Sequence, residues 1–568
     1  MRATNMKNTI SKAILHHLAP MAAVALLLTA TAYAAAPGIT GTTFNLTAQP
    51  AYISQPDGQA VYSWGYGCNG SPSGFAPATT TTPFCNPMQV PGPTLIVTEN
   101  VPFSVNLTNG LPTAAGNTSI LFPGLQLTSV ASGTPGLLTQ EAAPGGTVTY
   151  NLVATSPGTR AYYSGTQGDL QVEMGLYGAI IVLPSSPPAS CTAVGSVPAH
   201  YVAPGNSAES DFRLAAAAYD HPRTCYDREY LFQFSEMDPN IHSQALAQVL
   251  AKAGCAVGAV GCSLNVPTEP YHPNYFMING RSMPDDMDTN YATQYPHQPY
   301  NGNPHMHPGE QVLLRIIGQG RWQHPFHEHG NHVRILARDG NLILSTSSPT
   351  DPNLAGPLLF TTTTTPGMAM DGIFYWTGKG LNWDAYGHNP ASSDPIAKLP
   401  CTPDANGYNT GNPAALNYYE WCQDHNKPMQ AAPFGDVAGG GPVTLPDANL
   451  FTNGAWYGGT PYFGPDAALR ADTTLRLDAN GTTGALSGCV TGGTVVTPGP
   501  NQGASGPTPN CTNLQPSNTQ ANPANERGWA FMWHSHNERE ITTNNVFPGG
   551  MLMMMLVDSR EFVIDESQ

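Results

Sequence analysis

The feature that most constrains this chain is a pair of closely spaced histidines that occurs twice. His327 and His329 lie within residues 323–332, and His534 and His536 lie near the C-terminus. Side chains alternate between the faces of a β-strand, so each pair should place both rings on one face. Imidazole is the commonest metal ligand and suits copper and zinc. Two such pairs on neighbouring strands would surround one ion, with the rest of the chain as their scaffold.

The composition favours a β-rich protein of more than one domain. A length of 568 residues exceeds one ordinary hydrophobic core and predicts two or three domains. Only 10% of the residues are charged, while 59 glycines and 54 prolines favour short strands joined by turns. The net charge of −17 argues against a basic groove for nucleic acid.

The first 34 residues have the pattern of a signal peptide. Arg2, Lys7 and Lys12 form a basic segment, residues 21–31 an apolar one, and Ala-Tyr-Ala at 32–34 a cleavage signal. No later run approaches the roughly 20 apolar residues that span a bilayer. We therefore expect a soluble, exported protein of the periplasm, the cell surface or the extracellular space, without a transmembrane segment.

The ten cysteines fit an oxidising compartment, and they occur along the chain as five close pairs. Five local disulfides are the simplest arrangement, although sequence alone leaves other connectivities open. The absence of a Cys-x-x-Cys motif argues against a thiolate metal cluster. The pairs are Cys68/Cys85, Cys191/Cys225, Cys255/Cys262, Cys401/Cys422 and Cys489/Cys511.

Alternating apolar and polar residues predict strands in two blocks of the chain. In the first block, about residues 36–190, the runs 103–108 and 147–152 alternate cleanly. A linker at 191–227 separates this block from a second one at 228–568. Strands at this spacing predict an all-β fold of tandem Greek-key β-sandwiches.

Residues 382–524 do not share this pattern. They are rich in Gly, Pro, Asn and Thr, contain four cysteines and show weak periodicity. A structureless loop of this length is uncommon in a compact domain. We interpret the segment as a disulfide-pinned, loop-rich insertion in the second domain. A three-domain organisation is the alternative if it contains a further sandwich.

Several motifs resemble those of the multicopper oxidase family. Pro91-Gly92-Pro93-Thr94 is similar to the opening of the family's first domain, and residues 175–178 to its close. Residues 324–330, His-Pro-Phe-His-Glu-His-Gly, resemble the HPxHLHG motif. The closing HCH…GM motif resembles residues 534–536 followed by Gly550-Met551.

This resemblance covers most of residues 85–190, 228–380 and 525–558. It implies tandem cupredoxin-like sandwiches, copper as the cofactor and oxidoreductase activity. Enzymes of the family take electrons from substrate at a type 1 copper, held by Cys, two His and often Met. They reduce dioxygen at a three-copper cluster held by eight histidines from four His-x-His motifs.

The first domain departs completely from the family pattern. Leu121 and Pro123 occupy the histidine positions of the first family motif. Tyr163 and Gly165 occupy those of the second. No histidine occurs anywhere in this domain, so it supplies no imidazole to a metal.

The type 1 copper site is also incomplete. Ser535 stands at the cysteine position and Glu540 at the downstream histidine position. A hydroxyl cannot replace the thiolate that defines a blue copper site. Met551 lies further along the chain than the family spacing allows, so His324 alone matches a type 1 ligand.

The resemblance carries the role of cluster ligand onto His327, His329, His534 and His536, and we add His324 as a fifth candidate metal ligand. Half of the eight cluster histidines remain, enough for one ion, or two if water or carboxylates complete the set. Both pairs survive together while the first-domain motifs are lost, which favours metal binding over relics in a core. Copper is the predicted cofactor, with zinc possible because an all-histidine tetrahedral site suits it.

Other polar residues near these motifs have plainer interpretations. Glu328 points away from its flanking histidines on a strand, which predicts a solvated or supporting role. His305 and His307 repeat the spacing but sit beside turn residues, so we expect them at the surface. The methionines at 553–555 are expected in the core.

The leading hypothesis is an exported copper-binding protein of this family, a copper-dependent oxidoreductase with a histidine-only site. Its partners would be a small-molecule reductant that approaches the metal directly, or free copper ions. The alternative is a non-catalytic copper-sequestering or structural surface protein on a degenerate oxidase fold. The sequence leans towards an enzyme without deciding between the two.

Overall fold

The computed structural model describes the chain in segments. They are residues 36–76, 85–192, 213–345, 353–379, 399, 401–413, 415, 417–423, 528–558, 560 and 564, with the backbone of β23 (Gly459–Tyr462), β24 (Val490–Thr491) and β25 (Thr494–Val495). The predicted signal peptide, most of the 382–524 insertion and the Cys489/Cys511 pair lie outside them. Within the described segments, no helix combines the length and the apolar character needed to cross a bilayer.

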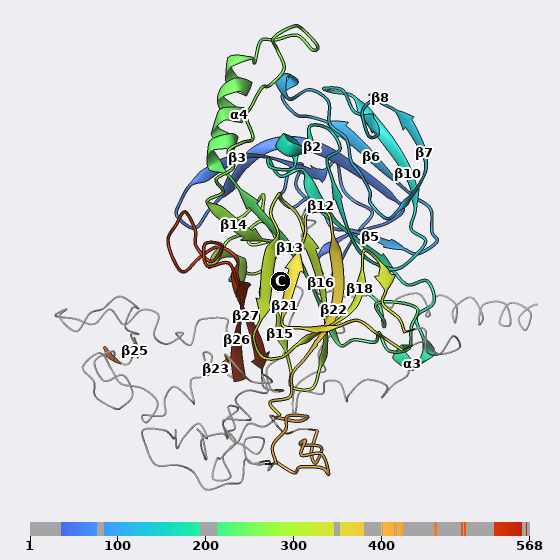
Figure 1. The fold of residues 1–568 in the computed structure, drawn as a ribbon, viewed down its shortest axis with the longest axis vertical. Coiled ribbons are helices and arrows are strands. Elements are labelled where there is room, and N and C mark those ends of the chain that lie inside the picture. The colour runs from blue at the N-terminus through green and yellow to red at the C-terminus, as the bar shows by residue number, and fades with distance from the viewer. Residues whose placement is uncertain are drawn as a thin grey trace, which may run out of the picture.

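Two five-stranded sheets form the N-terminal sandwich, drawn in blue to teal in Figure 1. One sheet has the order β11 (Gly158–Tyr163), β12 (Tyr177–Leu183), β5 (Leu95–Thr98), β1 (Gly38–Thr40) and β4 (Gly74–Ala76). The other has the order β3 (Ala60–Cys68), β2 (Thr43–Ser54), β6 (Phe103–Asn109), β10 (Thr147–Val153) and β7 (Gln126–Ser132). The small elements are η1 (Thr113–Ala115), β8 (Thr134–Pro135), β9 (Gln140–Glu141), α2 (Gly168–Gln171) and α3 (Ala189–Thr192).

The predicted alternation explains how these sheets form their core. Every second residue of β6 is buried, and β10 follows the same period. The two strands are antiparallel with Tyr150 opposite Val105, so their apolar faces coincide. Fully buried Trp64 and Leu107 belong to the same core.

A seven-stranded and a six-stranded sheet form the C-terminal sandwich, drawn from green to red. The larger sheet has the order β14 (Tyr275–Ile278), β13 (Arg228–Met237), β16 (Gln311–Gly318), β22 (Ala369–Tyr375), β18 (Val333–Arg338) and β19 (Asn341–Leu342), with β20 (Leu358–Leu359) paired to β18. The smaller one has the order β15 (His305–Met306), β27 (Leu552–Asp558), β26 (Gly528–Ser535), β17 (His324–Glu328) and β21 (Thr361–Thr364), with β23 paired to β26. A 3₁₀ turn, η2 (Asp285–Met287), precedes β15.

The longest described helix, α4 (Pro239–Ala251), joins the two sandwiches. Asp238 caps it by accepting a hydrogen bond from the backbone N–H of Asn240 at 2.9 Å. Its buried His242 donates from Nδ1 to the carbonyl of Tyr62 on β3, at 2.6 Å. The helix therefore ties the start of the C-terminal sandwich to the N-terminal one.

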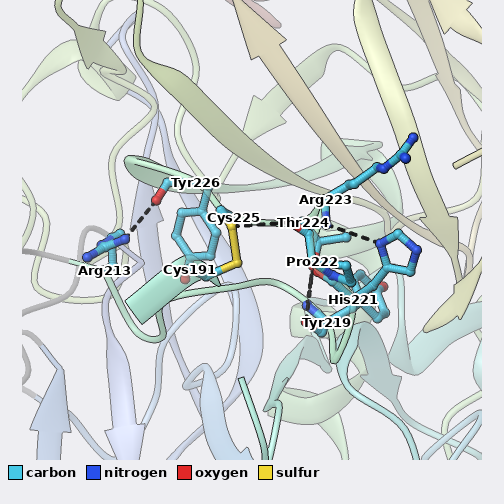
Figure 2. The surroundings of a disulfide bond; sticks show 9 residues. All are labelled: Cys191, Arg213, Tyr219, His221, Pro222, Arg223, Thr224, Cys225 and Tyr226. Carbon is cyan, nitrogen blue, oxygen red and sulfur yellow. Dashed lines mark hydrogen bonds between the residues drawn. A yellow bond between two sulfur atoms is a disulfide. The ribbon is translucent and has the colours of Figure 1, made fainter. Parts of the chain in front are cut away.

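Further contacts fix the two sandwiches to each other. Asp371 on β22 accepts hydrogen bonds from the backbone N–H and the hydroxyl of Thr159 on β11, at 3.0 and 2.6 Å. The Cys191–Cys225 disulfide joins α3 to the segment ahead of β13 (Figure 2). Beside it, Arg213 donates to the carbonyl of Tyr226 at 3.0 Å.

The structure confirms the all-β prediction of tandem cupredoxin-like sandwiches. Four of the five predicted disulfides are formed: Cys68–Cys85, Cys191–Cys225, Cys255–Cys262 and Cys401–Cys422. The domain boundaries drawn from the sequence stay predictions.

Candidate metal centre

The two His-x-His pairs lie on adjacent antiparallel strands, as the sequence predicted. In the β17–β26 register, His327 stands opposite His534. The backbone N–H of His536 donates to the carbonyl of Pro325 at 2.7 Å, which extends the pairing past the end of β26. Residues opposite each other in a sheet share a face, so all four imidazoles project from the same side.

The four rings lie against one another. The centroid of His327 is 4.9 Å from those of His329 and His536 and 5.6 Å from that of His534. The centroid of His534 is 5.2 Å from that of His329 and 5.6 Å from that of His536. The Nε2 atoms of His329 and His534 are 3.2 Å apart. We call these residues the four-histidine cluster.

Two of the rings are oriented by hydrogen bonds on their other nitrogen. His327 Nδ1 bonds to the hydroxyl of Thr361 on β21 at 2.9 Å. His534 Nδ1 donates to the carbonyl of Ser535 at 2.7 Å. Metal-binding histidines usually make such a bond with the nitrogen that does not bind the metal. In both residues Nε2 is therefore the nitrogen available to an ion.

The cluster favours uncharged imidazoles. Burial, followed by the neighbouring charges of His329, His534 and His536, lowers the pKa of His327 to about 4. Burial also lowers the pKa of His534. Both rings are neutral at pH 7, which is the form that binds metals.

The donor set fits copper, although the rings have not converged on one point. Among the described residues, no group of three or more His, Cys, Asp or Glu side chains is already arranged around a single ion. The 3.2 Å separation of His329 Nε2 and His534 Nε2 is nevertheless close to the roughly 3.3 Å between two ligands of a tetrahedral ion with bonds of about 2.0 Å.

The cluster opens to solvent on one side. His327 and His534 are only 5% and 6% exposed, whereas His329 is half-buried and His536 is exposed. The ring of Phe360, itself 55% exposed, stands 5.7 Å from that of His327. A small molecule can therefore approach the imidazoles from the side of His536 and Phe360.

The opposite face of the same two strands holds His324 in a different environment. Its Nδ1 lies 2.9 Å from Glu540 Oε2 and its Nε2 lies 2.8 Å from Glu236 Oε2, and the ring is fully buried. Burial alone would lower the pKa of His324, but the hydrogen bonds and charges of Glu236 and Glu540 raise it to about 9. The residue is an imidazolium held between two carboxylates. As placed, both of its nitrogens contact carboxylates, so its role as a metal ligand stays a prediction.

The three residues at the positions that resemble a type 1 copper site thus form one hydrogen-bonded group. The hydroxyl of Ser535 donates a hydrogen bond to Glu540. Ser535 stands at the position that resembles the family's cysteine, and Glu540 at the one that resembles its histidine. Asn537 Nδ2 also donates to Glu540, at 2.8 Å. We call His324, Glu236, Glu540 and Ser535 the carboxylate clamp.

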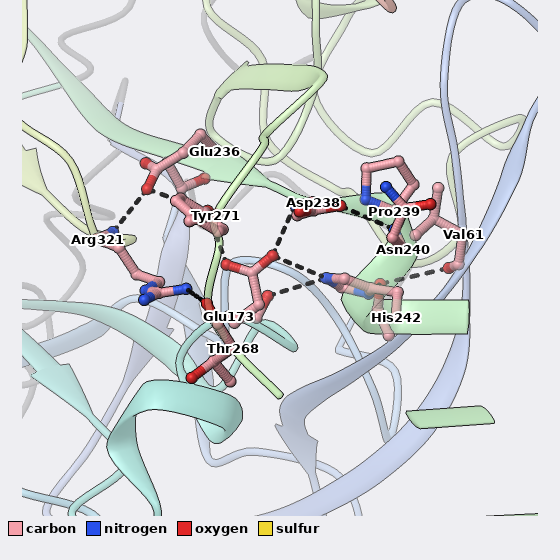
Figure 3. A network of polar contacts seen from close by, with 12 residues as sticks. Val61, Glu173, Glu236, Asp238, Pro239, Asn240, His242, Thr268, Tyr271 and Arg321 are labelled. Atoms are coloured by element: carbon pink, nitrogen blue, oxygen red, sulfur yellow. Dashed lines mark hydrogen bonds and ion pairs between the residues drawn. The ribbon is translucent and has the colours of Figure 1, made fainter. Parts of the chain in front are cut away.

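The clamp continues towards the N-terminal sandwich (Figure 3). Glu236 accepts from the hydroxyl of Tyr271 at 3.2 Å and from the backbone N–H of Arg321 at 2.7 Å. Tyr271 also donates to Glu173, at 2.7 Å. Sequence reasoning missed Glu236 and Glu173, although a glutamate inside a strand buried on both faces, as in β13, signals a charged partner.

Two expectations about neighbouring residues, those for His305 and His307, are wrong. Glu328 faces away from the cluster as predicted. It is buried, which excludes a solvated role and leaves the supporting one, and burial raises its pKa to about 8. His305 and His307 lie against Asp558 rather than at the surface. Their Nδ1 atoms are 2.7 Å from Asp558 Oδ2 and 3.0 Å from its backbone oxygen, respectively.

Comparisons with known proteins indicate the multicopper oxidase family. Residues 75–187 and 267–371 each match a family profile described as multicopper oxidase. A search of curated proteins finds no match. Three similar solved structures show the nature of the likeness. The multicopper oxidase mgLAC is 19% identical, with 58% of this chain and 74% of that chain covered and a TM-score of 0.36.

Two similar structures come from Nitrosomonas europaea. Its blue copper oxidase is 19% identical, with 58% of this chain and 74% of that chain covered and a TM-score of 0.35. Its copper nitrite reductase is 17% identical, with 59% and 84% covered and a TM-score of 0.35. Structural likenesses this low give no argument about function. The assignment to the family therefore rests on the two family profiles.

Proposed function

We propose that this chain, a divergent member of the multicopper oxidase family, binds copper through His327, His329, His534 and His536. The observation that supports this most is the four-histidine cluster itself, in which four imidazole rings from two adjacent strands face one another. Imidazole nitrogens suit copper, and a histidine-only set needs no thiolate. Bound there, copper would supply one-electron chemistry.

The chain's own residues prepare this site in three ways. Thr361 and the carbonyl of Ser535 bind Nδ1 of two of the rings and so turn their Nε2 atoms towards the cluster. Burial keeps His327 and His534 uncharged at neutral pH. The exposed sides of His536 and Phe360 leave room for a small-molecule reductant to reach the cluster directly.

We further propose that the protein is exported. The four disulfides support this, because such bonds persist in oxidising compartments. The export signal predicted at residues 1–34 can be tested by N-terminal sequencing of protein recovered outside the cytoplasm. A mature N-terminus following residue 34 is expected.

Copper binding is tested by elemental analysis of the mature protein after loading and desalting. About one copper per chain is expected in the wild type, and none in the His534→Ala/His536→Ala variant. His272→Ala, which removes an exposed histidine outside the cluster, is the control and should keep its copper. The absorption spectrum should lack an intense blue band, because Ser535 replaces the thiolate. Wild type without stoichiometric copper would contradict the proposal, as would stoichiometric zinc in its place.

One observation bears on the alternative of a copper-sequestering protein. His324, Ser535 and Glu540, at the positions that resemble the family's type 1 copper site, are hydrogen-bonded to one another, which argues against a second copper that delivers electrons there. Oxidation of a small reductant by the copper-loaded protein separates the two functions. Turnover abolished by His534→Ala/His536→Ala supports an oxidoreductase. Tight copper binding without turnover supports sequestration.

A further inference from the structure

A second site lies away from the four-histidine cluster, between the two sandwiches. A cavity of about 300 Å³ opens there, within the volume range of small-molecule sites. The N-terminal sandwich contributes Leu121, Tyr163 and Gly165 to its wall, and the C-terminal sandwich contributes Gln319, Arg321 and Gly367.

The N-terminal wall of the cavity contains residues at the positions that resemble the family's first-domain histidine positions. Leu121 and Tyr163 form a β-bridge, with the N–H of Leu121 donating to the carbonyl of Tyr163 at 2.8 Å. A Cβ on Gly165 would lie 2.7 Å from Leu121 Cγ, so the glycine makes room for the leucine. These residues now present an apolar surface.

The polar side chains of the opposite wall are already engaged. Arg321 donates from Nη2 to Glu269 at 2.7 Å and from Nη1 to the carbonyl of Thr268 at 2.8 Å, and it lies over the ring of Tyr271. Gln319 donates from Nε2 to the carbonyl of Gly178 at 2.9 Å. The cavity therefore offers no uncompensated charge to an ionic ligand, and an uncharged ligand fits it better.

One polar group in the wall remains without a partner. Tyr163 is half-buried, and within the described part of the chain its hydroxyl makes no hydrogen bond. It lies beside Gly367, where an added Cβ would stand 3.3 Å from the hydroxyl oxygen. Because Gly367 also lines the cavity, a bound molecule can accept a hydrogen bond from this hydroxyl.

We infer that this cavity binds a small, neutral, mainly apolar carbonyl compound, whose oxygen accepts a hydrogen bond from Tyr163. The apolar wall supplies most of the contact area and the single donor fixes the orientation, as is usual for small-molecule sites. The inference does not depend on metal in the four-histidine cluster, because the two sites share no residue.

The test uses two probes of the same shape and the full mature chain. Acetophenone carries a carbonyl acceptor, and α-methylstyrene carries a methylene group in its place. Binding of both is followed by ligand-observed NMR titration. Wild type should bind acetophenone more tightly than α-methylstyrene. Tyr163→Phe should weaken the binding of acetophenone about fivefold and leave the binding of α-methylstyrene unchanged. Failure of wild type to bind acetophenone at millimolar concentration would overturn the inference. An equal loss of affinity for the two probes in Tyr163→Phe would also overturn it.

A second pair of variants locates the site. Leu138 lines the cavity, whereas its neighbour Leu137 is 93% exposed and does not. Leu138→Asp places a charge at the apolar rim and should weaken the binding of both probes at least about threefold. Leu137→Asp should change the binding of neither probe. Equal effects of the two aspartates would mean that the probes bind elsewhere, which would also overturn the inference.

Discussion

The two faces of the β17–β26 ribbon hold histidines in opposite states. On one face, the four-histidine cluster keeps His327 uncharged, with a pKa near 4, because its neighbours are other imidazoles in a partly buried site. On the other face, His324 is more deeply buried but has a pKa near 9, because two carboxylates contact its nitrogens. Burial acts in the same direction on both, so the partners decide the charge. One face is suited to a cation, and the other already contains one.

The largest expected effect comes from removing the cation of the clamp. In His324→Leu, the buried Glu236 and Glu540 lose their shared positive partner. We expect the free energy of unfolding at pH 7 to fall by about 3–5 kcal/mol. Urea unfolding followed by tryptophan fluorescence measures it. His272→Ala is the exposed control, with a change within about 0.5 kcal/mol. A loss below about 1 kcal/mol in His324→Leu would show that the clamp is not an ion pair.

The charge of His324 should also appear as a pH dependence of stability. Its pKa of about 9 in the folded protein lies above the ordinary value of 6.5. Its contribution is therefore complete below about pH 6.5 and disappears as the pH rises through 9, a change of about 3 kcal/mol. The difference in unfolding free energy between wild type and His324→Leu should shrink over this window. A difference that stays constant to pH 10 would contradict the raised pKa.

Copper affinity should change with substitutions on the face of the four-histidine cluster and not with those on the opposite face. His327 contacts all three other rings of the cluster, so His327→Ala should lower copper affinity by at least about 100-fold. Folded His324→Leu should keep its copper stoichiometry. Competition with a chromophoric chelator measures both variants. Loss of copper in His324→Leu but not in His327→Ala would reverse the assignment of the two faces.

A smaller effect is expected from the residue that orients His327. Thr361→Val removes the hydroxyl bonded to His327 Nδ1 and keeps the side-chain shape. Copper affinity should fall about tenfold, the lower end of the range for such supporting partners. Thr363→Val, at an exposed position of the same strand, is the matched control and should leave affinity unchanged.

The smallest effect is expected at the second buried glutamate of the ribbon. Glu328 has a pKa near 8 and is therefore mostly protonated at pH 7. Glu328→Gln exchanges one neutral group for another and should change the unfolding free energy by less than about 1 kcal/mol. Glu540→Gln, which removes a charged partner of His324, should cost several times more. Equal costs would mean that the two carboxyl groups carry the same charge.

Local periodicity explains why the sequence predicted the strands and the common face of the histidine pairs. A spacing of two residues fixes the face of His327 and His329 whatever the rest of the fold does. The carboxylate clamp was not predictable in this way, because Glu236 and Glu540 lie 88 and 216 residues from His324. Only the tertiary fold brings them together.

The alternative left open for Glu328 and the error at His305 have a related cause. The alternation gave the correct face for Glu328, but no local pattern shows whether that face meets solvent or the core. His305 was expected at the surface because of its turn neighbours. In the fold, the parallel pairing of β15 with β27 brings it next to Asp558. Register and layer packing are long-range properties.

The disulfide between Cys191 and Cys225 has a consequence for handling the protein. It spans a sequence separation of 34 residues between the last helix of the N-terminal sandwich and the first strand of the C-terminal one. Proteolytic cleavage between these cysteines would therefore leave the two halves covalently attached. Such nicked protein would migrate as one band on a non-reducing gel and as two on a reducing gel. A single full-length band on a non-reducing gel is consequently no evidence that the chain is uncut.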